Sequence, residues 1–427
     1  MPRFTALVWN LEQYGTKFQS VAHETQGLRA QALELLRARL VAAIVAAAEA
    51  DVVVIQEFRE PARIVLPALV ATVQAARERA AAGDWLFDWL PSAWSSVDTP
   101  TGFDDLGFGA TANHEGYAVI WREGALARLD SRLSAGVSAT VSSPRRSHFI
   151  SLVLAGGTLA FDATDDPPIT FAAPTTALGF PPSTCPIVGS NIQTRGTPIG
   201  HSSNEVIASM RYVRRPCVVM LAPVRTPLVT YHAPVGQNSS RSDYYGTLIG
   251  FAADALQGQR AAYAGDFNVV SQPNQRSLYA RSVALDYDVS TFVQRGSTGP
   301  IEPLRSVVHY VNHAGDGYRR GSAVLGSARD YAFLRNHETD GTTLVYDALG
   351  ALKAALGDSQ RLRASVATIS QNWTEVIAEI EVGAIVRAFL AGESLPDGTD
   401  ENTALAIIYR ELISDHLPVA LRYTVTD

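Results

Sequence analysis

The stretch AYAGDFNVVS, residues 262–271, is the most informative segment of this chain. A small apolar run reaches Gly265, and Asp266 and Asn268 follow at alternate positions. Residues i and i+2 of a strand lie on the same face, so the carboxylate and the carboxamide point to one side. Gly, Asp and Asn are also ordinary turn residues. The pair is therefore either the turn that ends a strand, or part of a metal or phosphate site with partners elsewhere in the chain.

Other predicted strands also end or begin at polar residues. Each of the apolar runs TALVW, VVVIQ and PLVTY is followed by a polar residue, YAFL is preceded by one, and two polar residues precede PVALRY across Leu417. These polar residues are Asn10, Glu57, His232, Asp330, Asp415 and His416. In antiparallel neighbours, the end of one strand lies beside the start of the next. We therefore expect these side chains to gather with Asp266 and Asn268 at one edge of the core.

The chemistry of this set is coherent, although each residue alone has an ordinary explanation as a turn residue, a cap or a solvated side chain. Oxygen ligands from Asn10, Glu57 and Asp415 suit a hard divalent cation such as Mg²⁺, which keeps waters for a substrate phosphate. His232 and His416 lack the thiolate or imidazole partners that zinc prefers. We interpret the two histidines as an acid and a base.

Apolar strands alternate with helical segments, which predicts an α/β layered fold. Three stretches depart from this alternation: a Pro-, Thr-, Ser- and Gly-rich loop at 162–204, an unassigned stretch at 271–328, and a helical segment at 345–411. Because strand residues resume at 418, we expect one domain, residues 1–427, with insertions. The helical segment either covers the active-site edge, mediates dimerisation or contacts a partner protein.

Composition limits the function classes. The net charge of −7 argues against a broad basic surface for nucleic acid, although a local basic groove is compatible with it. Cys185 and Cys217 lack metal-ligand spacing, and they either pair or stay free. The apolar run at 40–55 is interrupted by Glu49 and Asp51, so no membrane span is expected. The start MPRFTALVWN has no signal-like region, which favours a cytoplasmic protein or a mature secreted form.

The motifs WNLE, QE, YHAP, GDFN, DY and SDHLPV occur in this order along the chain. In that order they resemble the endonuclease/exonuclease/phosphatase superfamily, the DNase I-like fold, and GDFN followed by SDHLPV is the specific part of the signal. The resemblance extends from Asn10 to Leu421. It implies a four-layer α/β sandwich of two packed mixed or antiparallel sheets flanked by helices. The segments at 162–204 and 345–411 have no counterpart in it.

Two segments are similar to the DNase I branch of this superfamily. HEGYAVIWR resembles a strand whose glutamate orients the catalytic histidine, which implies that Glu115 is the partner of His232. QEFRE resembles the stretch after the metal-binding glutamate, which implies a DNA contact for Arg59, with a surface ion pair to Glu60 as the alternative. The abasic-site repair branch usually has a tyrosine in place of His232, which counts against that role.

The resemblance also implies roles in phosphodiester hydrolysis. His416, held by Asp330, takes a proton from the attacking water, and His232, held by Glu115, protonates or stabilises the leaving oxygen. The implied metal ligands are Asn10, Glu57 and Asp415, and Asp266 and Asn268 position the phosphate, a second cation, or both. The cation is Mg²⁺, with Mn²⁺ or Ca²⁺ as alternatives.

The sequence therefore predicts a Mg²⁺-dependent DNA endonuclease with little sequence preference. A phosphoesterase that acts on a lipid or a small phosphorylated molecule is the alternative, and the negative net charge suits it better. A non-catalytic binding module of the same fold is a third reading, which the intact set of acidic residues and histidines opposes. Arg145, Arg146, Arg214 and Arg215 form either a basic rim or an ordinary solvated face.

Overall fold

The structure is a computed structural model of the whole chain. It describes residues 3–14, 17–19, 30–59, 66–77, 85–91, 115–126, 150–155, 158–163, 169–171, 193–194, 197–198, 217–224, 226–232, 261–270, 272–284, 287–294, 297, 299–308, 325–335, 341–371, 376–377, 380–396 and 399–425.

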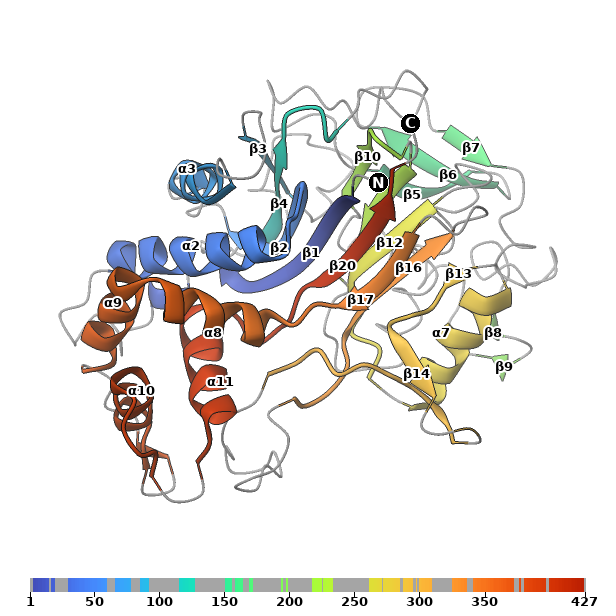
Figure 1. Ribbon diagram of the computed structural model, residues 1–427. Helices are drawn as coiled ribbons and strands as arrows, with labels where there is room; N and C mark the ends of the chain where they lie inside the picture. The colour runs from blue at the N-terminus through green and yellow to red at the C-terminus, as the bar shows by residue number, and fades with distance from the viewer. Residues whose placement is uncertain are drawn as a thin grey trace.

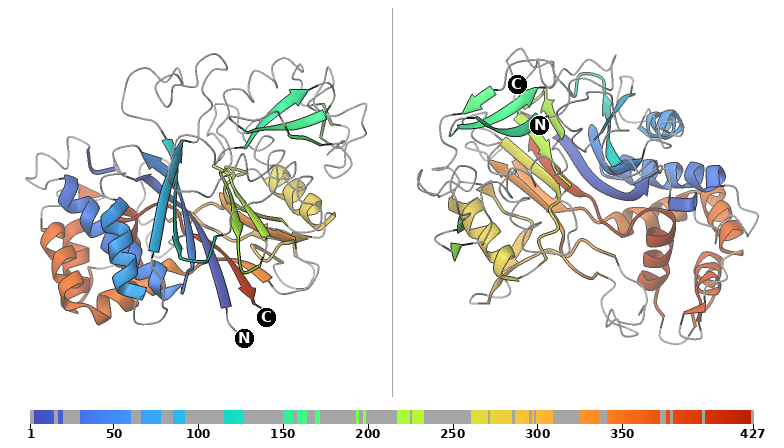
Figure 2. Two further views of the ribbon diagram at one scale, coloured as in Figure 1. Left: turned by 90° about the horizontal axis from the view of Figure 1, so that it is seen from above. Right: turned by 180° about the vertical axis from the view of Figure 1, so that it is seen from behind.

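The first large sheet is mixed and has six strands in the order β17-β20-β1-β2-β4-β3. Their bounds are β17 (Gly341–Val345), β20 (Val419–Thr424), β1 (Arg3–Tyr14), β2 (Val52–Arg59), β4 (Glu115–Arg122) and β3 (Trp85–Pro91). β1 and β2 run parallel, and the other neighbours are antiparallel. The pairing of β1 with β20 brings the two ends of the chain together, as Figure 2 shows.

The second large sheet has five strands in the order β10-β11-β12-β16-β13. Their bounds are β10 (Cys217–Leu221), β11 (Thr226–Thr230), β12 (Ala261–Asp266), β16 (Asp330–Arg335) and β13 (Tyr287–Asp288). Alternate residues of both sheets, such as Val8, Val54, Ala264 and Leu334, fill the core between them. This packing follows from the period of two that the apolar strand residues show.

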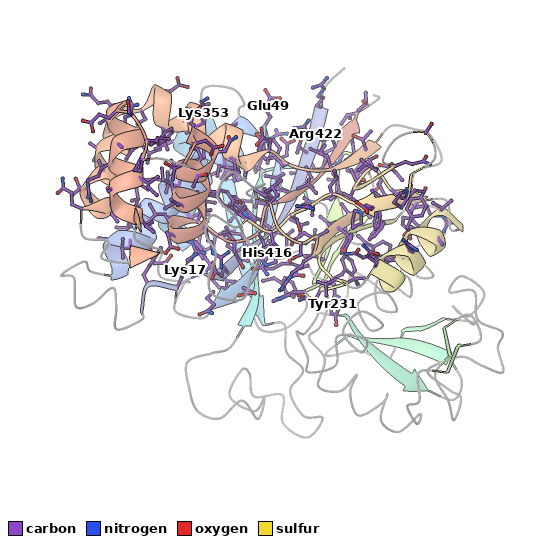
Figure 3. The ribbon with its side chains drawn as sticks, turned by 90° about the horizontal axis from the view of Figure 1, so that it is seen from below. Lys17, Glu49, Tyr231, Lys353, His416 and Arg422 are labelled. Carbon is purple, nitrogen blue, oxygen red and sulfur yellow. The ribbon has the colours of Figure 1, made fainter. Side chains whose placement is uncertain are left out.

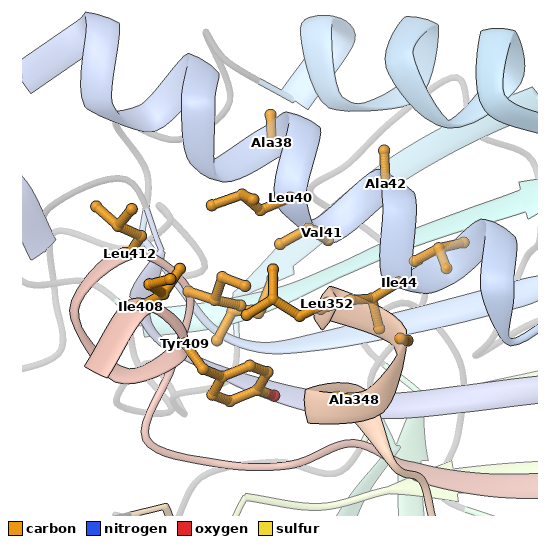
Figure 4. Packing of buried hydrophobic residues seen from close by; sticks show 14 of the residues in the cluster. Ala38, Leu40, Val41, Ala42, Ile44, Ala348, Leu352, Ile408, Tyr409 and Leu412 are labelled. Carbon is orange, nitrogen blue, oxygen red and sulfur yellow. The ribbon is translucent and has the colours of Figure 1, made fainter. Parts of the chain in front are cut away.

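Helices cover the outer faces of both sheets, which completes the four-layer α/β sandwich (Figure 1). The layer on the first sheet contains α2 (Ala30–Ala47), α3 (Leu66–Arg77), α8 (Ala348–Asp358), α9 (Gln360–Ser370), α10 (Val382–Ala391) and α11 (Glu401–Leu412). Figure 4 shows α2, α8 and α11 packing against one another through residues such as Val41, Leu352 and Ile408. On the far side, α7 (Gln272–Ala284) lies beside the second sheet.

Most of the helical segment 345–411 therefore packs into the main core. Side-chain caps begin three of its helices: Asp347 accepts from Gly350 N, Ser359 from Leu362 N and Asp400 from Thr403 N. The stretch 271–328, which the sequence left unassigned, contributes α7 and the hairpin β14 (Phe292–Gln294) and β15 (Ile301–Pro303).

Short elements complete the described part of the chain. They are the 3₁₀ turn η1 (Lys17–Gln19), the sheet of β5 (Ile150–Ala155), β6 (Thr158–Ala163) and β7 (Ile169–Phe171), and the pairs β8 (Gln193–Thr194) with β9 (Thr197–Pro198) and β18 (Val376–Ile377) with β19 (Ile380–Glu381). Short strands thus occur inside the expected loop 162–204, whose other residues lie outside the described ranges. Among the helices described, none has the length and apolar character to cross a membrane.

Strand direction brings the polar strand ends to one edge, as the sequence predicted. β12 and β16 are antiparallel, so Asp266, at the end of one, pairs with Asp330, at the start of the other. β1 and β20 are also antiparallel, which sets the end of β1 beside the segment that precedes Val419. Register shifts interrupt β1 after Asn10 and β2 after Ile55. Such irregularities are common beside active sites, where they redirect side chains.

Only glycine fits at position 265, near the end of β12, because there is no room for a Cβ atom and the backbone φ is positive. Its φ is +149°, and an added Cβ would lie 2.2 Å from the Tyr231 carbonyl oxygen and 2.4 Å from Gln56 Nε2. We expect Gly265→Ala to lower the free energy of unfolding by about 2–4 kcal/mol, because backbone must move. Urea denaturation measures this change. The matched control is Gly357→Ala in α8, where a Cβ meets nothing within 4 Å. An equal loss of unfolding free energy in Gly265→Ala and Gly357→Ala would contradict the clash as the cause.

Candidate active site

The polar side chains meet at the edge where the two sheets approach each other. Figure 3 looks onto this edge, with His416 near its centre and Lys17 and Tyr231 on either side. The described site residues come from the ends of β1, β2, β11 and β12, the start of β16 and the segment before β20. They are almost completely buried, apart from Glu57 and Asp415, whose side chains are 18% and 24% exposed.

His416 and Asp330 form a buried hydrogen-bonded pair. Their Nδ1 and Oδ2 atoms are 2.7 Å apart. The Ser306 hydroxyl donates to the same carboxylate oxygen at 2.7 Å, and it accepts from the backbone N–H of Asp330 at 3.0 Å. A carboxylate on Nδ1 favours the tautomer that leaves Nε2 free to accept a proton. The sequence-based pairing of His416 with Asp330 agrees with this contact.

The backbone of His416 is also fixed on both sides. The Ser414 hydroxyl donates to the carbonyl of Asn10 at 2.6 Å and accepts from His416 N at 3.0 Å. The carbonyl of His416 accepts from Trp9 Nε1 at 2.8 Å and from the Tyr409 hydroxyl at 2.7 Å. The imidazole therefore stands on a backbone that is tied to both β1 and α11.

Glu57 is positioned by the end of β1. Its Oε1 accepts from Asn10 Nδ2 at 3.0 Å, and its Oε2 accepts from Gln13 N at 3.0 Å. Asn10 Nδ2 also lies 3.3 Å from Asp266 Oδ2, while Asn10 Oδ1 accepts from Glu12 N at 2.9 Å. The amide of Asn10 thus presents its NH₂ group to the two carboxylates. To ligate a cation through Oδ1, as the sequence suggested, this amide must rotate by half a turn.

Both histidines face Asp266. His232 Nε2 lies 3.7 Å from Asp266 Oδ2 and 3.6 Å from Glu57 Oε1. His416 Nε2 lies 3.8 Å from the same Asp266 oxygen and 3.6 Å from Asp415 Oδ1. Gln56 Oε1 accepts from Asp266 N at 3.0 Å, and this bond links the two sheets directly below the site. Asp266 is therefore the centre of the cluster.

Burial and mutual charge shift the pKa values of two of these groups. Burial, the largest influence, raises the pKa of Asp266 to about 6, although the charges of His416 and His232 oppose it. Burial lowers the pKa of His416, but the carboxylates of Asp330, Asp415 and Asp266 outweigh it and raise that pKa well above its ordinary value. Perturbed pKa values of this kind within one cluster are typical of catalytic sites.

The donor set fits a hard divalent cation. Asp415 Oδ1 is buried and has no hydrogen-bond partner in the described part of the chain, and such an oxygen is costly unless a donor or a cation satisfies it. One carboxylate oxygen each of Asp266 and Asp330 and one ring nitrogen of His416 lie within 4.8 Å of one another. Because Asp330 already holds His416 Nδ1, the carboxylates that remain as candidate cation ligands are those of Asp415, Glu57 and Asp266.

Asn268 ends the GDFN motif in a left-handed conformation. Its φ is 51°, and its N–H donates to Asp266 Oδ1 at 2.8 Å. Its Oδ1 lies 3.4 Å from Arg329 Nη1, which donates to it. Arg329 is itself held through its backbone, since its N–H donates to the Ser306 hydroxyl and its carbonyl accepts from Phe267 N. The site therefore includes a guanidinium beside the carboxamide expected to face a phosphate.

Some predicted residues lie partly or wholly outside the described side chains. The backbones of Arg59 and Glu115 pair with each other across β2 and β4, but their side chains are not described. Tyr117 shares a strand face with Glu115, and its hydroxyl accepts from His232 N at 3.1 Å. Cys185, the side chain of Cys217, and Arg145, Arg146, Arg214 and Arg215 also lie outside the described set.

Several site residues were not predicted. Gln56 and Ser414 stand inside the QE and SDHLPV motifs, so a signal for them existed. The sequence marked Tyr117 only as the tyrosine two residues after Glu115. Ser306 and Arg329 lie in or beside the unassigned stretch 271–328, where no local pattern marks them. They enter the site through long-range pairing that a single sequence does not reveal.

The chain was compared with known proteins. No curated protein matches the chain. Among solved structures, an endonuclease/exonuclease/phosphatase family protein from Leptotrichia buccalis is 11% identical, with a TM-score of 0.39 and 99% of both chains covered. A Bacteroides thetaiotaomicron mannosyl-6-phosphatase is 12% identical, with a TM-score of 0.38 and 98% of both chains covered. D. rerio TDP2, complexed with a single-strand DNA product, is 11% identical, with a TM-score of 0.35 and coverage of 99% of this chain and 100% of that one.

The family model described as "Endonuclease/Exonuclease/phosphatase family" matches residues 8–416, a span that runs from β1 through His416. It includes every described residue of the polar cluster at the sheet edge. The chain therefore belongs to the endonuclease/exonuclease/phosphatase family.

Proposed function

We propose that this chain is a Mg²⁺-dependent phosphodiesterase that cuts DNA internally with little sequence preference. One observation carries the proposal: the imidazole of His416, held at Nδ1 by Asp330, directs Nε2 toward Asp266, 3.8 Å away, where the carboxylates and His232 converge. A held imidazole beside a cation-binding carboxylate cluster is suited to hydrolysis of a phosphate ester.

The chain's own residues supply the proton transfers. His416 accepts a proton at Nε2 from the attacking water, while Asp330 stabilises the imidazolium that forms. His232 donates from Nε2 to the leaving oxygen, and Glu115 is its proposed partner at the other nitrogen. Asn268 and Arg329 orient the phosphoryl oxygens, since an amide and a guanidinium are donors that match them, and Asp266 would act on the phosphate through the cation that it is proposed to bind.

Glu57, Asp415 and Asp266 are the proposed cation ligands, with Asn10 joining them if its amide turns. The cation, when bound, neutralises charge on the phosphoryl oxygens. Asp415 and Asp266 also raise the pKa of His416. Asp415 and Asp266, once engaged as ligands, would stabilise the His416 imidazolium less, which favours the neutral imidazole that a base requires. Mn²⁺ or Ca²⁺ are the alternatives to Mg²⁺ for the same oxygen ligands.

DNA is the proposed substrate because QEFRE and HEGYAVIWR resemble the DNase I branch, and because Arg59 stands two residues after the proposed cation ligand Glu57 on β2. A second candidate is a lipid or small phosphorylated molecule. The net charge of −7 favours it, since acidic proteins repel a polyanion outside a local basic groove.

The test is nicking of supercoiled plasmid with Mg²⁺, with EDTA, and across a salt series. We expect nicking only with the cation, lost in Glu57→Gln and His232→Ala, and a steep fall with salt because several phosphates are neutralised. Glu393→Gln, an exposed carboxylate on the helical layer, is the matched control and should nick like the wild type.

Two outcomes separate the candidates. Absence of nicking together with cation-dependent hydrolysis of p-nitrophenyl phosphate esters would move the assignment to the small-molecule phosphoesterase. Absence of hydrolysis of either substrate by a folded protein would remove the enzyme assignment.

A further inference from the structure

Arg37 on α2 is a completely buried arginine directly behind the site. Its Nη2 donates to the carbonyl of Ile413 at 2.5 Å, to that of Glu12 at 3.0 Å, and also to that of Leu11. Leu11 and Glu12 belong to the end of β1, which carries Asn10. Ile413 directly precedes the SDH residues of the site. One guanidinium thus joins two segments that lie at opposite ends of the sequence.

The surroundings of Arg37 are built for a buried cation. Glu34 Oε1 lies 3.7 Å from its Nη1, and the rings of Tyr14 and Phe18 lie 4.9 and 5.8 Å from its Cζ. A buried charge is tolerated only with such partners. A planar guanidinium serves several carbonyls and stacks on aromatic rings at once, which an ammonium does not do as well.

The backbone that Arg37 holds is unusual. Glu12 and Gln13 have φ values of 38° and 51°, and Glu57 has a φ of 55°. Non-glycine residues adopt such values only where the surroundings impose them. Gln13 N in turn donates to Glu57 Oε2 at 3.0 Å. The guanidinium therefore stabilises the turn that places a hydrogen bond on a proposed cation ligand.

A second cation reinforces the same junction. Lys17 in η1 pairs with Glu12 Oε2 at 2.5 Å and donates to the carbonyl of Arg410, near the end of α11. Lys17 contacts the end of β1 through the side chain of Glu12, whereas Arg37 binds backbone carbonyls of both segments. Arg37 thus helps to fix their spacing, together with the hydrogen bond from the Ser414 hydroxyl to the Asn10 carbonyl.

We propose that Arg37 is a positioning residue for the divalent-cation site. It holds the turn at Glu12 and Gln13 against the segment before Asp415, and so sets the separation of Glu57 and Asp415 without touching cation or substrate. The inference rests on the proposed function in one respect, namely that the cation binds at these carboxylates.

The experiment measures Mn²⁺ binding by electron paramagnetic resonance for the wild type, Arg37→Lys and Arg37→Met, with circular dichroism and thermal unfolding in EDTA. We expect both folded variants to bind Mn²⁺ at least about tenfold more weakly, as for other residues that orient metal ligands. At saturating Mn²⁺, Arg37→Lys should recover much of the wild-type turnover, since its charge remains. In a third variant, Arg37→Ala, added guanidinium ion should restore Mn²⁺ affinity.

Arg122→Met is the matched control. Arg122 forms an ion pair with Asp51 at 3.0 Å, at the opposite end of β2 from Glu57. Loss of that pair is expected to lower the unfolding temperature without changing Mn²⁺ affinity.

Wild-type affinity in folded Arg37 variants would overturn the inference, and so would failure of both Lys and Met variants to fold, since Arg37 would then serve the fold. Absence of Mn²⁺ binding by the wild type would overturn the inference and the proposed cation site together. Mn²⁺ binding by the wild type without hydrolysis of any phosphate ester would count against the proposed function alone.

Discussion

Replacement of His416 by Asn is expected to lower the rate of phosphodiester hydrolysis by about 10²–10⁴-fold, the range for loss of a general base. Asp330→Asn is expected to lower it by at least about tenfold, because an amide NH₂ facing Nδ1 favours the tautomer with hydrogen on Nε2. Since the two residues act as one unit, the double variant should be no slower than His416→Asn alone. Single-turnover cleavage at saturating Mg²⁺ measures all three.

The control for the Asp330 substitution is Asp358→Asn, an exposed carboxylate at the end of α8. It should cleave at the wild-type rate. A double variant whose loss of cleavage rate equals the product of the two single losses would show that His416 and Asp330 act independently. That result would contradict a functional role for their 2.7 Å contact.

Replacement of Asp266 by Asn is expected to abolish cleavage and yet to stabilise the metal-free protein at alkaline pH. Burial raises the pKa of Asp266 from 3.8 to about 6 in the fold. A raised carboxyl pKa contributes stability that is complete below pH 3.8 and is lost as pH rises through about 6. With 1.36 kcal/mol per pKa unit, the loss is about 3 kcal/mol.

The measurement is urea unfolding in EDTA at the two ends of this pH range. The difference in unfolding free energy between the wild type and Asp266→Asn should shift by about 2–3 kcal/mol in favour of the variant as pH rises. Added Mg²⁺ should restore stability to the wild type much more than to the variant. A constant difference at all pH values would mean that Asp266 is not held in an unfavourable charged state.

The sequence predicted the strands and the edge at which the site forms, because both depend on short-range patterns. Short apolar runs identified β1, β2 and β12, and polar residues at their ends identified Asn10, Glu57 and Asp266. Antiparallel pairing then brings Asp330 opposite Asp266, as expected. Short apolar runs bounded by polar residues carry enough information for these steps.

The sequence predicted that Asp330 holds His416, but it did not predict Ser306 or Arg37, which hold Asp330 and the segment before Asp415 in place. Ser306 reaches Asp330 from a stretch with no recognisable period, and Arg37 reaches Ile413 across the helical layer. Both contacts depend on tertiary packing, and in a single sequence a buried arginine on a helix cannot be distinguished from a solvated one. The helical segment 345–411 was expected as an insertion, yet Leu352 and Ile408 pack in the main core beside α2.

The most direct test is a Mg²⁺ titration in which DNA cleavage and the rise in unfolding temperature are followed on the same protein, for the wild type and for Glu57→Gln. The account predicts that both wild-type curves rise with one midpoint, and that both are shifted to much higher Mg²⁺ or lost in Glu57→Gln. Cleavage in EDTA at the wild-type rate, or an unchanged midpoint in Glu57→Gln, would contradict a cation-dependent site at these residues.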